Sequence, residues 1–376
     1  MESVWYRVAM VVLAASGVAR AEIRYQVTEL GDLGQHFADP YALNELGHVA
    51  GVSARPQNQI KPFFWSSTTG MVDFSPSGNP GSFPTGFATG INDLDQVVGY
   101  RYPDAKQYPR AFVWSSSAGF QTLGTLGGPD SYATAINNAG QITGYAGIPN
   151  GLAHAFVYDP ANGMRDIATL SGNSYARSIN ENGQVAGMIG VDGQAQAFRW
   201  RDETGMVLLG TLGGILSQGY GINNAGHVVG MAATAENGGN FTGHAFLYDE
   251  TGMHDLGTLG DIYSEAAAIN DRDEVVGYSY IHGDQYVRGF IHDGTTMRDL
   301  NDLIDPASGW RISLPHDINN AGQIVALALG STEPWAHAVL VTPIPEPAVS
   351  TVALAGCVGA MWKVRRRVTY RASSAR

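Results

Sequence analysis

The chain consists of a repeated unit, and this repeat constrains the fold more than any other feature of the sequence. The pattern (I/L)-N-x-x-(G/D)-x-(V/I)-x-(G/A) occurs seven times, at intervals of roughly 46 residues. Its asparagines are Asn44, Asn92, Asn137, Asn180, Asn223, Asn270 and Asn319. A unit that recurs at a fixed period buries its apolar face against its neighbours, so we expect the seven units to form one continuous structure.

Each unit divides into four short strands. In the third unit the predicted strands are SYATAI (131–136), QITGYA (141–146), HAFVYD (154–159) and MRDIATL (164–170). Apolar and small residues alternate along them, as is typical of β-structure packed on both faces. Four antiparallel strands in a unit of about 40–45 residues indicate a propeller blade. We therefore predict an all-β, seven-bladed β-propeller over residues 22–342.

The last unit is one strand short, which bears on how the ring closes. It supplies predicted strands at 314–318, 323–329 and 337–342 and then meets a proline-rich tail. Near the other end, ELGDLG (29–34) matches DLGTLG (255–260) of a fourth strand. We expect the N-terminal strand to complete the last blade, which leaves no open sheet edge between the two ends. The alternative is a linear β-solenoid, which needs capping units that the sequence lacks.

The repeated Asn is expected to start the turn between the first two strands. In AINNAGQITGY (135–145), Asn137 is predicted to bond the turn backbone and Gly140 to adopt a positive φ. Replacing Asn137 by Ala is then expected to cost about 1 kcal/mol.

Two of these turns, INDLDQVVG (91–99) and INDRDEVVG (269–277), are acidic and invite a calcium interpretation. A calcium loop needs six to eight oxygen ligands, whereas these turns enter a strand after four residues. Asp and Asn are also common in tight turns for backbone reasons. We therefore predict no metal site and no cofactor, with calcium as the alternative at these two turns.

Residues 1–21 have the features of a signal peptide. Arg7 precedes an apolar run from Val8 to Val18, and Ala19-Arg20-Ala21 is a small–x–small cleavage triplet. We expect signal peptidase to cleave after Ala21; the alternative is a buried N-terminal strand.

Residues 343–376 have the features of a sorting tail. Pro345-Glu346-Pro347 is followed by an uncharged stretch, 348–362, and then by Arg365, Arg366 and Arg367. The stretch is short for a helical span, but a terminal anchor can adapt to the bilayer, and the arginines favour the cytoplasmic side. The tail resembles the PEP-CTERM signal of Gram-negative exported proteins. That resemblance implies a transient inner-membrane anchor, processing by an exosortase, and a final place at the cell surface or outside the cell. The alternative is a plain anchor that is never cut.

A second motif follows each repeated Asn. It reads PFFW (62–65), AFVW (111–114), AFVY (155–158), AFRW (197–200), AFLY (245–248), GFIH (289–292) and AVLV (338–341). His154, His244 and His337 precede three of these copies. On these residues the body resembles the extracellular HAF-repeat family, a resemblance that brings no defined activity. The three histidines fall on different blades, so we expect each to make a structural hydrogen bond rather than to share a metal.

Charge and composition exclude several classes of function. The net charge is −12 and the two ends are mostly basic, so the body between them is more acidic still. Nucleic acid is therefore not an expected partner, because phosphate binding needs a basic patch. Cys357 is the only cysteine and lies in the tail, so the body has no disulfide and no thiolate nucleophile.

No catalytic set is predicted. The recurrent acids lie at the edges of the outer strands, where they are expected to cap turns: Asp159, Asp166, Asp249, Asp255 and Asp299. A GxSxG nucleophile motif is absent from the sequence.

The positions that differ between units are the candidates for binding. Aromatic and basic residues gather in loops expected on one face, and Tyr41, Arg177, Tyr220, His316 and Asp317 interrupt the small residues of the first strands. The predicted ligand-binding residues are Tyr102, Tyr108, Arg110, Arg177, Tyr220, Tyr280, Tyr286, Arg288, Trp310, His316 and Trp335. Aromatic rings beside polar donors suit sugar faces or peptide side chains.

These observations favour a non-enzymatic, exported structural or adhesive module that binds an exopolysaccharide or a surface protein. The alternative is a secreted polysaccharide lyase or glycoside hydrolase that works at the axial opening with Arg177, Tyr220 and His316.

Overall fold

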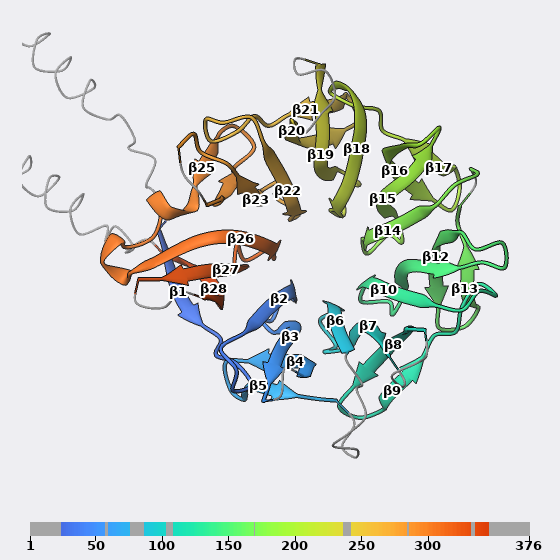
Figure 1. Ribbon diagram of the computed structural model, residues 1–376, viewed down its shortest axis with the longest axis horizontal. Coiled ribbons are helices and arrows are strands. Elements are labelled where there is room, and N and C mark those ends of the chain that lie inside the picture. Colours follow the sequence, from blue (N-terminus) through green and yellow to red (C-terminus); the bar gives the residue numbers. More distant parts are fainter. Residues whose placement is uncertain are drawn as a thin grey trace, which may run out of the picture. The chain divides into compact units, whose positions relative to one another are not determined.

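Seven four-stranded antiparallel sheets are arranged in a ring and form a seven-bladed β-propeller (Figure 1). The computed structural model describes residues 24–56, 59–75, 86–102, 108–168, 170–235, 242–283, 286–331 and 335–345. Contacts divide the chain into Arg24–Pro343, which holds the propeller, and the two terminal segments. Within the described ranges no helix is long and apolar enough to cross a membrane. The predicted signal peptide (1–21) and membrane span (348–362) lie outside the described residues.

Six blades are continuous in sequence, and in each the first strand lies innermost (Figure 1). Blades one to three contain β2 (Ala38–Leu43), β3 (Val49–Arg55), β4 (Gln59–Ser66) and β5 (Gly70–Asp73); β6 (Gly86–Ile91), β7 (Val97–Arg101), β8 (Arg110–Ser115) and β9 (Gly119–Thr122); and β10 (Ser131–Ile136), β11 (Ile142–Gly147), β12 (Ala153–Asp159) and β13 (Gly163–Asp166). Blades four to six contain β14 (Ser174–Ile179), β15 (Val185–Val191), β16 (Gln194–Arg201) and β17 (Gly205–Leu208); β18 (Gly213–Ile222), β19 (Val228–Thr234), β20 (Gly243–Asp249) and β21 (Gly252–Asp255); and β22 (Ser264–Ile269), β23 (Val275–Ser279), β24 (Arg288–His292) and β25 (Met297–Asp299).

The seventh blade joins the two ends of the propeller, as the strand count predicted. It contains β26 (Trp310–Ile318), β27 (Ile324–Gly330), β28 (Ala336–Ile344) and the N-terminal β1 (Arg24–Glu29), in the order β1-β28-β27-β26. The 3-10 turns η2 (Leu300–Asp302) and η3 (Pro306–Ser308) precede it. The solenoid alternative is therefore wrong.

Glu29 and Leu30 reproduce at this closure the contacts of an ordinary fourth strand. The amide of Leu30 donates to the carbonyl of Ala338 at 2.9 Å, as that of Leu256 does to Ala245. His337 Nδ1 lies 2.8 Å from the Glu29 carboxylate, and the equivalent His154 lies 2.7 Å from Asp166. The expected structural hydrogen bond of the repeated histidines is thus present, and at the closure its acid comes from the other end of the chain.

The blade core depends on a glycine and a phenylalanine placed opposite each other. Gly144 on β11 pairs with Phe156 on β12, and the Phe156 side chain is fully buried. A Cβ on Gly144 would overlap the carbonyl oxygen of Tyr132 on the inner strand. The equivalent Phe is buried in each of the first six blades. In the seventh blade Ala326 faces Val339, so there too a small residue on the second strand lies opposite a larger one on the third.

The fourth strands are shorter than predicted. The strand expected over 164–170 is β13, which ends at Asp166. The amide of Ile167 still donates to Ala155 at 3.0 Å, and the Asp166 carboxylate accepts a hydrogen bond from the amide of Ala168 at 2.8 Å.

The repeated asparagines form a closed ring of hydrogen bonds, which the sequence did not predict. Each Nδ2 donates to the main-chain carbonyl of the Asn in the next blade, at 2.8–3.1 Å, and Asn319 donates to Asn44 across the closure. Each side chain also holds its own turn; in the third blade Asn137 Oδ1 accepts from the amide of Gln141 at 2.9 Å. Gly140 has φ +77°, as predicted. The Asn therefore shapes the turn and also joins neighbouring blades.

The residue after each Asn forms a second, more exposed ring. Its carboxylate or amide oxygen accepts the main-chain N–H of the equivalent residue in the preceding blade, at 2.8–3.2 Å. The members are Glu45, Asp93, Asn138, Glu181, Asn224, Asp271 and Asn320. We call these two sets the lower rings, and the face that carries them the lower face.

Candidate functional site: the axial cup

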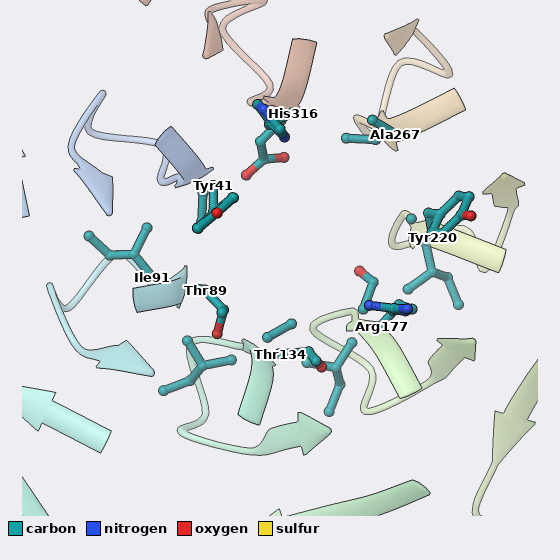
Figure 2. A pocket seen from close by; sticks show the side chains of 18 of the residues that line it. Tyr41, Thr89, Ile91, Thr134, Arg177, Tyr220, Ala267 and His316 are labelled. Carbon is teal, nitrogen blue, oxygen red and sulfur yellow. The ribbon is translucent and has the colours of Figure 1, made fainter. Parts of the chain in front are cut away.

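Every inner strand has a β-bulge three residues before its repeated Asn. On β10, for example, the pairing with β11 skips from Ala133 to Ala135 and leaves Thr134 unpaired. A bulge re-aims the side chain of the extra residue, and here the seven side chains surround the axis (Figure 2). The seven bulge residues are Tyr41, Thr89, Thr134, Arg177, Tyr220, Ala267 and His316.

These residues separate two cavities on the axis and line both of them. The upper cavity, of about 430 Å³, opens on the face opposite the lower rings and is walled by Phe87, Tyr100, Tyr132, Tyr145 and Glu265. We call it the axial cup. The lower cavity, of about 230 Å³, continues along the axis past Asp317. The cup is within the size range of small-molecule sites.

One side of the cup is a wall of aromatic rings. Cross-strand pairs bring Phe87 against Tyr100 and Tyr132 against Tyr145, with ring centroids 4.8 and 4.6 Å apart and nearly parallel planes. Tyr100 also meets Tyr132 edge-on at 4.9 Å, so the two pairs support each other. Burial raises the pKa of Tyr100 to about 12, which keeps this phenol neutral. The wall offers flat apolar surface with hydroxyl groups.

The charged groups of the cup and channel are mostly acidic. The Arg177 side chain is exposed to the cavity. Glu265 accepts hydrogen bonds from the hydroxyls of Tyr263 at 2.7 Å and Tyr278 at 3.1 Å. His316 Nε2 lies 3.2 Å from the carboxylate of Asp39. The arrangement does not present the basic surface that a polyanion requires.

Asp317 is the most perturbed acid in the channel. Burial raises its pKa to about 7, although it accepts hydrogen bonds from the amides of Leu43 and Ile318, both at 2.9 Å. The bond to Leu43 joins the seventh blade to the first, so Asp317 belongs to the ring closure as well as to the channel.

The structure brings together three of the residues predicted to bind ligand: Arg177, Tyr220 and His316, all at the cup. Trp310 and Trp335 share a different cavity at the edge of the seventh blade. Tyr280 lines a third cavity, with Tyr263 and Tyr278 of the sixth blade.

The other predicted residues lie on the surrounding loops and strand ends. Tyr102 meets the edge of Tyr100, and Tyr108 is 60% exposed. Arg110 donates to the carbonyl of Pro129. Tyr286 lies under the guanidinium of Arg311, and Arg288 pairs with Asp299 at 3.2 Å.

The aromatic wall was missed because it lies on strands rather than loops. Phe87, Tyr132 and Glu265 all stand five residues before a repeated Asn, a position that differs from unit to unit. Tyr100 and Tyr145 are their partners on the second strands. Aligning the units and searching for positions that break the repeat would have found them.

The acidic turns considered for calcium use their oxygens within the protein. Asp95 Oδ1 lies within hydrogen-bond distance of both Asn44 and His48, and Asp93 bonds the amide of Glu45 and the side chain of Asn138. Over the ranges that the structure describes, no group of three or more His, Cys, Asp or Glu residues is arranged to hold a metal ion.

Comparison with known proteins supports the fold alone. No family model and no curated protein matches the chain. Among solved structures, virginiamycin B lyase from Staphylococcus aureus aligns with a TM-score of 0.52 at 12% identity, over 85% of this chain and 100% of that one. The β-propeller domain of the Trilobed protease from Pyrococcus furiosus, described as having an open velcro topology, aligns with a TM-score of 0.53 at 10% identity, over 82% and 98%.

Proposed function

We propose that this protein is a non-enzymatic binding module that holds a neutral glycan in the axial cup. The observation that supports this most is where the repeat breaks down. The turn Asn recurs in all seven blades, whereas the bulge position is Tyr in two blades, Thr in two, and Arg, Ala and His in the others. The backbone around the bulge position is the same in every blade and does not require its side chain to differ. The variation is what a binding site for an asymmetric ligand would show.

The cup has the chemistry that a neutral sugar requires. The parallel ring pairs Phe87–Tyr100 and Tyr132–Tyr145 provide faces for stacking against sugar C–H groups. Arg177, Glu265 and the tyrosine hydroxyls provide directional hydrogen bonds for hydroxyl groups. The hydroxyls of Thr89 and Thr134 donate to the carbonyls of Ala133 and Ala176 in the next blades, so toward a ligand they act as acceptors.

Binding to a glycan array by the purified protein tests this proposal. We expect neutral glycans to bind, and Tyr132→Ala or Arg177→Ala to lower the affinity at least tenfold. Val207→Ala, at a 42% exposed site outside the cup, is the control and should leave affinity unchanged. Exclusive binding of uronate polymers, or affinity that ignores the cup variants, would contradict the proposal.

A lyase or hydrolase at the same opening is the weaker candidate. It is favoured only by the meeting of Arg177, Tyr220 and His316 in one cavity. Burial, and then the nearby Glu265, raise the pKa of Tyr220, so its phenol is a poor base near neutral pH. Glu265 and Asp317 also oppose the approach of a uronate. Depolymerisation of an exopolysaccharide that is abolished by His316→Ala would nevertheless establish the enzyme.

We further propose that the protein is exported, with signal peptidase and an exosortase as processing enzymes, and acts at the cell surface or in the extracellular matrix. The support is the sequence of the two terminal segments and the tail's resemblance to PEP-CTERM signals. The exported protein should begin at Glu22; an N-terminus at Met1 in exported material would refute cleavage.

A further inference from the structure

A second cavity lies on the edge of the seventh blade, away from the axis. It has a volume of about 400 Å³, and none of its lining residues lines the axial cup. Residues from three separate parts of the chain line it: Glu29 and His36; Ser308, Gly309 and Trp310; and Gly330, Ser331, Trp335 and His337. We call it the rim cavity. Glu29 and His36 reach it because the N-terminal strand β1 lies beside β28 in this blade (Figure 1).

Two tryptophans dominate its walls, and each is held by a histidine. The rings of Trp335 and His36 stack with centroids 5.0 Å apart and planes 27° apart. Trp310 meets His337 edge-on at 5.3 Å, and Glu29 anchors His337 at 2.8 Å. Because Glu29 anchors the histidine that contacts Trp310, this indole is oriented before a ligand arrives, which limits the side-chain freedom lost on binding.

The polar side chains that line the rim cavity are two hydroxyls, one carboxylate and the imidazoles of His36 and His337. The hydroxyls belong to Ser308 and Ser331, and the carboxylate belongs to Glu29. The described residues that line the cavity include no Lys or Arg. Flat aromatic faces beside neutral donors and acceptors match a sugar ring, which has apolar C–H faces and a rim of hydroxyls.

We propose that the rim cavity is a second glycan-binding site, independent of the axial cup. Its ligand class is a neutral mono- or disaccharide unit, held between Trp310 and Trp335 and hydrogen-bonded by Ser331 and Glu29. Two sites on one propeller connect two glycan chains, or two points on one chain, and raise the overall avidity without any new contact. The rim site does not depend on the cup, so each can fail without the other.

Gly330 provides a way to block the cavity without removing its walls. It lies directly opposite Trp310 on the neighbouring strand, and its φ is not in the left-handed region. A Cβ placed there would lie 3.6 Å from the Trp310 ring and 3.9 Å from His337 Nε2, which is ordinary contact. Gly330→Leu is therefore expected to fold and to fill the cavity beside Trp310.

The experiment measures how many ligands each protein molecule binds. The probes are neutral hexasaccharides of β-glucan, α-glucan and mannan, titrated into the full protein and followed by calorimetry and tryptophan fluorescence. Wild type should bind two equivalents, Gly330→Leu and Trp310→Ala one, and Trp310→Phe two. Tyr132→Ala, in the cup, should remove the other equivalent and leave the fluorescence change of the rim tryptophans.

Several results would overturn the rim site. They are a single equivalent in wild type that Tyr132→Ala abolishes, two equivalents in Gly330→Leu, and no binding of any of these probes. Circular dichroism spectra and melting temperatures of the variants separate loss of binding from loss of fold. A cup that binds nothing while Trp310→Ala removes a measured site would refute the function proposed for the cup and keep the rim site.

Discussion

The lower and upper ends of the inner strands differ in what their side chains do. At the lower end the same asparagine stands in every blade, and its side chain is consumed by hydrogen bonds to its own turn and to the next blade. At the axis and toward the upper end, the bulge residues differ from blade to blade, and Arg177 stays exposed. The residues that repeat make the contacts that build the ring. The residues that vary from blade to blade are the ones that a ligand can contact. Four changes test this contrast, ordered here by their expected effect on stability.

The largest effect is expected in the blade core. Phe156→Ala deletes a fully buried ring that fills the space opposite Gly144 and should lower the free energy of unfolding by about 3–5 kcal/mol. Urea denaturation measures the loss. Phe37→Ala, at a 41% exposed site, should cost less than about 1 kcal/mol. A folded Phe156→Ala protein that keeps stability but loses glycan binding would reverse the assignment of roles.

The second effect depends on pH and on Asp317. Burial raises its folded pKa to about 7 from 3.8, so between these values the folded state holds a proton that the unfolded state has released. Stability is therefore fully present near pH 4 and is lost as pH rises through 7, by roughly 2–4 kcal/mol.

Asp317→Asn tests the assignment, because it removes the titrating group. Urea denaturation at pH 4 to 8 should show a flatter profile for this variant, which should be the more stable protein at pH 8. Asp202→Asn, at an exposed surface pair with Arg165, is the control and should keep the wild-type slope. An unchanged slope in Asp317→Asn would assign the pH dependence to other groups.

The third effect concerns the lower rings. Asn137→Ala removes the turn bond to Gln141 and the interblade bond to Asn180, whose buried carbonyl then keeps only the amide of Gly183. The expected cost is about 1–3 kcal/mol, above the value for a turn bond alone. Thermal denaturation measures both variants, and Asn138→Ala, in the exposed ring, should lower the free energy of unfolding by less. Equal costs would show that the interblade bond to the buried carbonyl adds nothing.

The smallest effect on stability is expected at the cup. Arg177→Ala should change the free energy of unfolding by no more than about 0.5 kcal/mol, because the side chain is exposed. Its effect should instead appear in glycan affinity. A large loss of stability in chemical denaturation would place Arg177 in the frame rather than in the binding surface.

Much of the fold could be predicted because its signals are local and repeated. The turn Asn, the glycine of the second strand and the Phe of the third recur in phase, and together they determine the blade and the number of blades. The closing strand was predictable because ELGDLG resembles a fourth strand, and the structure shows Glu29 and Leu30 making fourth-strand contacts. The interblade bond of Asn137 was not predicted, because the accepting carbonyl belongs to Asn180, in the next unit.

The candidate site was only partly predictable. We predicted from the composition of the loops that Trp310, Trp335 and Tyr280 lie on one face. The structure places them in cavities away from the axis. Arg177, Tyr220 and His316 were found because they interrupt runs of small residues. Phe87 and Tyr132 were missed because an aromatic residue on a strand is ordinarily a packing residue.

The sequence by itself determined a ring of seven blades and how that ring closes, because each unit repeats the contacts that its neighbours require. Only the tertiary structure decided which of the varied residues meet. A bulge turns Thr134 toward the axis, and closure sets the segment bearing His36 beside Trp335, although they are far apart in the chain. Contacts of this kind depend on the curvature of the whole ring, which cannot be inferred from any short stretch of the sequence.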